Sequence, residues 1–416
     1  MSILFHSVRL DADKCQGCTN CIKRCPTEAI RVRNKKAYII SDRCIDCGEC
    51  IRVCPHHAKY AVSEHYNELV KYKYRIALPA PALYGQFNNL ENVDYVLTGL
   101  KKMGFDDVVE VSKGAEILSS ATREMFSSGE LKKPVISSAC PAVVRLIRTR
   151  FPDLLGNLLP TCAPIDIAAK IAREKARKET DYSDEEIGVF FITPCPAKRT
   201  AISNPLCHEN YGINGAIAIK DIYPVLVQTM DKLEESELES INDSGVIGVS
   251  WASSGGEAAG LLKERYLAAD GIENVINVLE ELENEKLNDL DFIELNCCTG
   301  GCVGGVHTVE NPYVAKARLQ RLRKFMPVSC NSLEDYFTID DLGWTKELTA
   351  SPAMKLADNV ITAMKMMSRL KAIESSLPGL DCGICGAPSC RAFCEDIVMG
   401  RIPADTPCPM VKGQKQ

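Results

Sequence analysis

Three cysteine-bearing stretches lie far apart in the chain: Ser137-Ser138-Ala139-Cys140-Pro141, Thr193-Pro194-Cys195-Pro196-Ala197-Lys198 and Cys298-Thr299-Gly300-Gly301-Cys302. Each follows or overlaps the end of a short apolar run, at 134–138, 189–193 and 292–295. Such runs predict buried strands. Ligands gather outside the carboxyl ends of strands in α/β sheets, so the four thiols predict one buried metal cluster. A lone cysteine there is usually a small core residue, but three motifs together favour the metal site.

Composition narrows the class of protein. The chain has 416 residues, 21 cysteines and a formal net charge of −6, and this length predicts several domains. We find no apolar stretch of transmembrane length and no signal peptide, so we expect a cytoplasmic protein with no membrane span. A disulfide-rich secreted scaffold is the alternative, but the length and the Cys-x-x-Cys spacings favour metal binding. The mild acidity argues against binding to nucleic acid.

The N-terminal region carries a doubled cysteine pattern. Residues 15–25 have the spacing Cys-x2-Cys-x2-Cys-x3-Cys-Pro, and residues 44–55 repeat it. This is the bacterial two-cluster ferredoxin pattern, in which the fourth cysteine serves the other cluster. We therefore expect residues 1–73 to form a ferredoxin-like α+β domain with two [4Fe–4S] clusters. Zinc is the competing interpretation, and the doubled spacing favours iron and sulfur. The expected ligand sets are Cys15, Cys18, Cys21 and Cys54 for one cluster, and Cys44, Cys47, Cys50 and Cys25 for the other.

The middle of the chain, residues 74–345, alternates apolar runs with helical stretches. This alternation predicts an α/β domain with mainly parallel sheets, covered on both faces. The strand candidates are 75–80, 107–111, 134–138, 187–193, 215–220, 245–250 and 291–295. The helix candidates include 92–103, 115–127, 164–179 and 256–269. Glycines at 255–256 and 300–305 fit no phosphate-binding pattern, and they would let the backbone approach a bulky cluster.

The C-terminal region contains a third group of cysteines. We expect a linking helix over residues 346–376 and a small module over residues 377–416. The module has the spacing Cys-x2-Cys-x4-Cys followed by a later Cys-Pro. It resembles a small [4Fe–4S] module found at the end of several redox and sensory proteins. Four thiolates suit zinc as well, so both metals stay open. The implied ligands are Cys382, Cys385, Cys390 and Cys408.

The three central motifs resemble the signatures of the [FeFe]-hydrogenase catalytic domain. The resemblance implies an H-cluster, which is a [4Fe–4S] cubane joined through one thiolate to a two-iron subsite with CO, CN⁻ and a bridging azadithiolate. Lys198 matches the lysine that hydrogen-bonds a cyanide, and a buried ammonium is stable beside such an anion. Pro81 and Ala82 lie in a segment that resembles the first pocket strand. The implied cluster ligands are Cys140, Cys195 and Cys298 for the cubane, and Cys302 as the bridging thiolate.

Several positions depart from the family pattern. Ala139 replaces a cysteine that acts as the terminal proton donor, and Thr193 and Asn296 replace two methionines beside the two-iron subsite. Glu257 and Glu294 are the candidates for a substitute proton route, because a buried carboxyl with a raised pKa can shuttle protons. The usual relay positions are occupied by Ser120, Arg123, Leu159 and Ala201.

These departures resemble the sensory branch of the [FeFe]-hydrogenases without a PAS domain. The resemblance implies reversible interconversion of H2 with protons and electrons at low activity, with electrons relayed by the accessory [4Fe–4S] clusters. The implied partners are a ferredoxin-like or other one-electron carrier, the hydrogenase maturation proteins, and a signalling kinase or phosphatase. The alternative is a non-catalytic electron-transfer or assembly-type protein that holds only the cubane.

Overall fold

The computed structural model describes residues 6–411. The N-terminal domain pairs strand β1 (Val8–Leu10) antiparallel with β4 (Lys59–Ala61), and its second pair joins β2 (Ile30–Arg33) to β3 (Lys36–Ile39). Two one-turn helices, α1 (Asn20–Lys23) and α2 (Glu49–Arg52), occupy equivalent places in the two cysteine repeats. The residues on either side of the second cysteine have positive φ in both repeats, Gly17 and Thr19 in the first and Asp46 and Gly48 in the second, so the two loops turn alike. This arrangement is the expected ferredoxin-like α+β fold.

The central domain contains two sheets, and every strand pair in them is parallel. The four-stranded sheet has the order β6-β5-β8-β9, and the three-stranded sheet has the order β10-β11-β7. The expectation of an α/β domain with parallel sheets is therefore confirmed. The bounds are β5 (Tyr74–Pro79), β6 (Asp107–Val108), β7 (Val135–Ile136), β8 (Ile187–Thr193), β9 (Gly215–Ala218), β10 (Tyr266–Asp270) and β11 (Phe292–Asn296).

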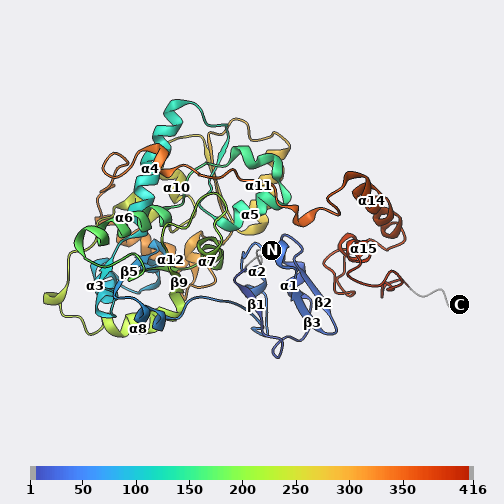
Figure 1. Ribbon diagram of the computed structural model, residues 1–416, viewed down its shortest axis with the longest axis horizontal. Coiled ribbons are helices and arrows are strands. Elements are labelled where there is room, and N and C mark those ends of the chain that lie inside the picture. Colours follow the sequence, from blue (N-terminus) through green and yellow to red (C-terminus); the bar gives the residue numbers. More distant parts are fainter. Residues whose placement is uncertain (1–5, 412–416) are drawn as a thin grey trace.

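Helices surround the two sheets (Figure 1). Strand β8 is buried over its whole length, and alternate side chains enter two different cores: Phe190 packs on one face of the sheet and Phe191 on the other. A strand covered on both faces is apolar at every position, which explains its continuous run. The helices are α3 (Asp94–Lys102), α4 (Val111–Ser128), α5 (Pro141–Arg150), α6 (Pro164–Glu179), α7 (Pro196–Ser203), α8 (Ile219–Met230), α9 (Val246–Ser250), α10 (Gly256–Gly260), α11 (Ile272–Glu283), α12 (Pro312–Leu322) and α13 (Ile339–Leu342).

Two local expectations are wrong. The apolar run 245–250 forms helix α9 instead of a strand, because a run this short does not distinguish the two by periodicity. This helix packs against α4 so closely that a Cβ on Gly248 would lie 2.3 Å from the carbonyl oxygen of Ser112. The helix expected over 256–269 ends at Gly260, and strand β10 follows it. Leu262 has φ 55° just after the helix, a left-handed conformation in which the helix cannot continue.

The C-terminal segment contains helix α14 (Val360–Glu374) and helix α15 (Cys390–Val398). The linking helix expected over 346–376 is thus wrong for its first half: Pro352 begins a short 3-10 turn, and the Asn359 side chain caps the start of α14. Helix α15 lies beside strand β2 of the N-terminal domain and α14 packs against α15, both away from the large α/β domain (Figure 1). The N-terminal domain and the C-terminal module are therefore in contact, although they are far apart in the sequence. No helix among the described residues is both long enough and apolar enough to cross a membrane.

Candidate metal centre

A central cavity of about 90 Å³ lies where the three cysteine motifs meet. The thiol-bearing residues of all three motifs border it: Cys140, Cys195, Cys298 and Cys302. It is also bordered by most of the other residues that the sequence singled out: Pro81, Ala82, Ala139, Lys198, Glu257, Glu294 and Asn296. Thr193 does not border this cavity. Its hydroxyl accepts a hydrogen bond from the Cys195 N–H over 3.0 Å and so shapes the turn after β8.

The ends of three strands bring the motifs together. Strands β7, β8 and β11 end at Ile136, Thr193 and Asn296, at or within two residues of the start of the three motifs. Cys140 and Cys195 are each followed by a proline that starts a helix, where the missing N–H costs nothing. Strands β7 and β11 are parallel neighbours in the three-stranded sheet, so their carboxyl ends lie at one edge of it. Strand β8 belongs to the four-stranded sheet and brings the second motif to the same cavity.

Glycines allow the third motif to close over the cavity. Gly301 has φ 90°, and a Cβ there would lie 2.5 Å from the backbone nitrogen of Ser254. A Cβ on Gly305 would lie 2.1 Å from the carbonyl oxygen of Pro194, in the second motif. Neither position has room for a side chain. The sequence predicts that these glycines let the backbone approach a bulky cluster. In the structure they let the backbone segments around the cavity pack closely against one another.

The thiols are in an unusual environment for cysteine. Burial raises the pKa of Cys140 and of Cys195, and it raises the pKa of Cys302 to about 12. Cys298 is the exception: a hydrogen bond from Cys297 and the nearby charge of Arg52 lower its pKa to about 6. Thiols that resist ionisation become thiolates only when a cation coordinates them. None of the 21 cysteines, all within residues 6–411, forms a disulfide.

Lys198 is the cation of the cavity. Its ammonium forms no ion pair with a carboxylate among residues 6–411, although its charge acts on Cys140, Cys302 and Glu257. A half-buried ammonium needs an anionic partner. The donor set of four thiols and one unpaired ammonium therefore fits an anionic iron–sulfur group bound through thiolates.

Two buried carboxyl groups, those of Glu257 and Glu294, border the cavity. Glu257 accepts a hydrogen bond from the Ser137 hydroxyl over 2.6 Å, and the same hydroxyl accepts one from the Ala139 N–H over 3.2 Å. Burial and the charge of Glu294 raise the pKa of Glu257 to about 8. Glu294 instead accepts hydrogen bonds from the N–H groups of Gly255 and Ala258, each over 2.9 Å, which favour its ionised form against the effect of burial. A proton is thus retained more easily on Glu257.

The eight N-terminal cysteines border two smaller cavities of about 20 Å³ each. The first, which we call N-terminal site 1, is bordered by Cys15, Cys18, Cys21 and Cys54. The second, N-terminal site 2, is bordered by Cys25, Cys44, Cys47 and Cys50. These are the two sets in which the fourth cysteine comes from the other repeat.

N-terminal site 2 lies next to the central cavity. The thiol of Cys297 faces the carbonyl oxygen of Cys47 at 3.8 Å. Arg52 of α2 donates to the carbonyl oxygen of Gly304 over 2.6 Å and to that of Cys47 over 3.3 Å. Cys47 itself borders both cavities. The sequence alone assigns no role to Arg52 or Cys297, because each makes its contact with a residue about 250 positions away in the chain. The one sequence signal for them is that each lies next to, or between, predicted cluster ligands.

The last four predicted ligands also lie together. Cys382, Cys385, Cys390 and Cys408 border a cavity of about 10 Å³, which we call the C-terminal site. Apolar side chains, among them Leu377 and Phe393, complete its lining. Cys394 is fully buried nearby but does not border the site.

The fold and these four thiol-lined cavities define an iron–sulfur protein of the α/β redox class. The chain belongs to the family of iron-only hydrogenase large subunits, because residues 73–306, more than half of its length, match the model described as the C-terminal domain of that subunit. Residues 7–55 match a 4Fe-4S dicluster domain, and residues 377–409 match an Fe–S cluster domain. Iron–sulfur binding is therefore supported in all three parts of the chain.

Individual relatives are distant. Iron hydrogenase 1 of Clostridium pasteurianum is 23% identical over 286 residues, which is 56% of this chain and 50% of that protein. The periplasmic [Fe] hydrogenase large subunit of Nitratidesulfovibrio vulgaris is 29% identical over 217 residues, which is 47% of this chain and 51% of that protein. The chain thus spans about half the length of these curated relatives. An apo [FeFe]-hydrogenase of Chlamydomonas reinhardtii shares the fold with a TM-score of 0.52 at 14% identity, covering 68% of this chain and 98% of that chain.

Proposed function

We propose that the protein interconverts H2 with protons and electrons at an H-cluster in the central cavity. Cys140, Cys195 and Cys298 would hold the cubane, and Cys302 would bridge to the two-iron subsite. The observation that carries the proposal is the meeting of these four thiols with the unpaired ammonium of Lys198 at one cavity. When bound, the H-cluster supplies the H2 chemistry, and the protein supplies ligation, orientation and electrostatics.

The cavity walls have distinct roles in this proposal. Lys198 donates a hydrogen bond to an anionic ligand of the two-iron subsite and offsets its charge. Pro81 and Ala82, both fully buried, form an apolar wall that excludes water from that side. Asn296 offers an amide where a relative would have a thioether, and it is already oriented by a hydrogen bond to Glu294 over 2.6 Å. The cavity is therefore more polar near Asn296 than the family pattern implies.

Proton delivery in this proposal uses Glu257 and Ser137. Ala139 carries no acidic hydrogen, so a proton must reach the cavity from another group. Glu257 holds a proton near neutral pH, and its hydrogen bond to Ser137 leads back to the first motif. Glu294 positions the turn that carries Glu257, because it binds the backbone on both sides of that residue.

Electrons would pass through N-terminal site 2, whose Cys47 borders the central cavity. Arg52 holds the two parts together and places a positive charge beside Cys298. One electron at a time would then continue to N-terminal site 1 and an external one-electron carrier. Maturation proteins would have to install the two-iron subsite, since a thiol cavity alone does not build it.

The replaced proton relay supports a sensory role in the cytoplasm. Turnover through a single buried acid is slow, and a slow enzyme is suited to report on H2 through its redox state. The partner in that case is a signalling kinase or phosphatase that responds to the state of the clusters. Weak turnover combined with tight H2 binding supports this role, whereas strong H2 evolution supports a metabolic enzyme.

The test is infrared spectroscopy and an H2 assay on protein produced with the hydrogenase maturation proteins. The parent is expected to show bands of iron-bound CO and CN⁻ together with measurable H2 turnover. Cys302→Ser is expected to lose both, while Cys330→Ser, at an exposed cysteine outside all four sites, retains both. Absence of the bands from fully matured parent protein would leave the alternative, an electron-transfer or assembly-type protein with only the cubane.

A further inference from the structure

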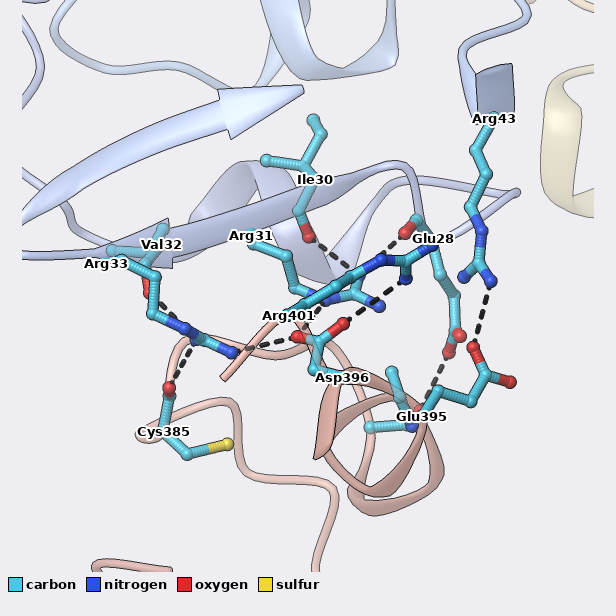
Figure 2. A network of polar contacts seen from close by, with 12 residues as sticks. Glu28, Ile30, Arg31, Val32, Arg33, Arg43, Cys385, Glu395, Asp396 and Arg401 are labelled. Carbon is cyan, nitrogen blue, oxygen red and sulfur yellow. Dashed lines mark hydrogen bonds and ion pairs between the residues drawn. The ribbon is translucent and has the colours of Figure 1, made fainter. Parts of the chain in front are cut away.

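A buried ionic contact joins the C-terminal module to the N-terminal domain (Figure 2). Asp396 of α15, which is fully buried, accepts hydrogen bonds from Arg31 over 2.7 Å and from Arg33 over 2.9 Å, both on strand β2. Beside it, Arg43 donates to Glu395 over 3.0 Å. Charges are removed from water only where their partners are held in place, because an unpaired buried charge is strongly destabilising. These paired charges therefore hold the C-terminal module in a fixed position against β2.

A backbone hydrogen bond joins a residue that borders N-terminal site 1 to the residue that follows a cysteine of the C-terminal site. The N–H of Val32 donates to the carbonyl oxygen of Gly386 over 2.8 Å, so the two backbones lie as close as neighbouring strands, about 5 Å apart. The side chain of Val32 borders N-terminal site 1, and Gly386 directly follows Cys385 of the C-terminal site. Gly386 has φ 79°, and a Cβ there would lie 1.9 Å from the carbonyl oxygen of Val32. This approach requires glycine.

The N-terminal domain also supplies cations to the C-terminal site. Arg33 donates to the carbonyl oxygen of Cys385 over 2.7 Å, and Lys23 donates to that of Pro388 over 2.9 Å. Both bonds end on the loop 382–390, which carries three of the four thiols. A cluster bound by four thiolates is anionic and gains one more negative charge on reduction. Nearby cations therefore stabilise its reduced form.

We propose that N-terminal site 1 and the C-terminal site hold adjacent iron–sulfur clusters that exchange single electrons, with Arg33 setting the reduction potential of the C-terminal cluster. The exchange moves one electron from the reduced cluster to the oxidised one, and no bond or proton changes place. The Arg31–Asp396 and Arg43–Glu395 contacts keep the separation constant. This inference rests on iron–sulfur occupancy in the proposed function, but it needs neither the two-iron subsite nor H2 turnover.

The experiment uses the full chain produced without maturation proteins and reduced with dithionite. Electron paramagnetic resonance during a redox titration is expected to show the C-terminal cluster, identified as the signal that Cys390→Ser removes. Spin–spin broadening between this signal and that of N-terminal site 1 is expected in the parent. Arg33→Met is expected to lower the potential of the C-terminal cluster alone. Arg177→Met is the matched control, because it removes an exposed guanidinium that pairs only with Asp184.

Asp396→Asn provides a second, independent variant. It weakens the contact with Arg31 and Arg33 and is expected to reduce the broadening, with the reduction potentials of the N-terminal clusters unchanged. Three results would each overturn the inference. They are zinc in the C-terminal site, no spin–spin broadening in the unsubstituted protein, and an unchanged potential of the C-terminal cluster in Arg33→Met. Since the sample lacks the two-iron subsite, none of these results depends on whether the matured protein turns over H2.

Discussion

The hydroxyl of Thr200 donates a hydrogen bond to the carboxylate of Asp46 over 2.7 Å. Asp46 lies between two predicted ligands of N-terminal site 2 and also accepts the backbone N–H groups of Ser7 and Val8. Thr200 lies on helix α7, which begins just after Cys195. This contact therefore sets the position of N-terminal site 2 relative to the central cavity.

Thr200→Val is expected to destabilise the protein by about 1.5–3 kcal/mol, because a buried carboxylate loses a donor. The measurement is thermal unfolding followed by circular dichroism. Thr229→Val, at an exposed hydroxyl that bonds only within its own helix, serves as the control and should leave the transition unchanged. Equal behaviour of the two variants would show that the Asp46 contact carries no stability.

Arg52→Met is expected to lower the reduction potential of the cubane at the central cavity. The substitution removes a positive charge and donor beside Cys298 and favours the oxidised cluster by roughly 1–3 kcal/mol. Arg52→Lys retains the charge and should recover part of the potential. Potentiometry of cubane-only protein measures the shift, with Arg24→Met as control, since Arg24 pairs with the same Glu49 but contacts no cubane ligand. An unshifted potential would remove Arg52 from the electron route.

Glu257→Gln is expected to lower H2 turnover of matured protein by about 10²-fold or more, because an amide cannot release the proton that a buried acid shuttles. The infrared bands of the cofactor should persist, which separates proton delivery from cofactor loss. Glu294→Gln is expected to act more weakly, by loosening the turn around residues 255–258. Glu285→Gln, outside the cavity, is the control. Unchanged turnover in both cavity variants would reject the acid route.

The pH dependence of stability should report the same carboxyl group. Burial raises the pKa of Glu257 from 4.5 to about 8, so folding favours its protonated form. This contribution is fully present below pH 4.5 and is lost as the pH rises towards 8. The stability advantage of the parent over Glu257→Gln should therefore decline across that window. Denaturant unfolding at several pH values measures it, and a difference that is independent of pH would contradict the raised pKa.

Gly301→Ala is expected to prevent cofactor binding at the central cavity. Alanine at φ 90° is strained by about 1–3 kcal/mol, and its Cβ would meet the Ser254 nitrogen at 2.5 Å. Iron content should fall and the infrared bands should be absent after maturation. Gly129→Ala tests the strain alone, because that glycine has φ 77° but no atom within 4 Å of the added Cβ. Normal iron content in Gly301→Ala would show that the loop tolerates displacement.

Much of the central fold could be predicted from local patterns. Strand β8 is buried over its whole length, so its sequence is a continuous apolar run, and β5 and β11 are mostly apolar with only Arg75 and Glu294 as charged residues. Helix α6 matches its predicted range, 164–179, because a proline starts it and its apolar face is regular. Helix α9 could not be predicted in this way. Its five residues make less than two turns, and the contact of Gly248 with α4 stabilises it instead.

The sequence by itself predicted which thiols lie near one another, because the cysteine motifs and the apolar runs before them can be recognised locally in the chain. Only the tertiary structure decided how the sites relate to one another: Glu257 meets Ser137 from 120 residues away, and Arg31 meets Asp396 from 365 residues away. Such contacts leave no periodic signal, since a buried charge or hydrogen bond depends on the position of its partner in space and not on its neighbours in sequence. The packing of the C-terminal module against β2 could therefore be recognised only in the folded protein.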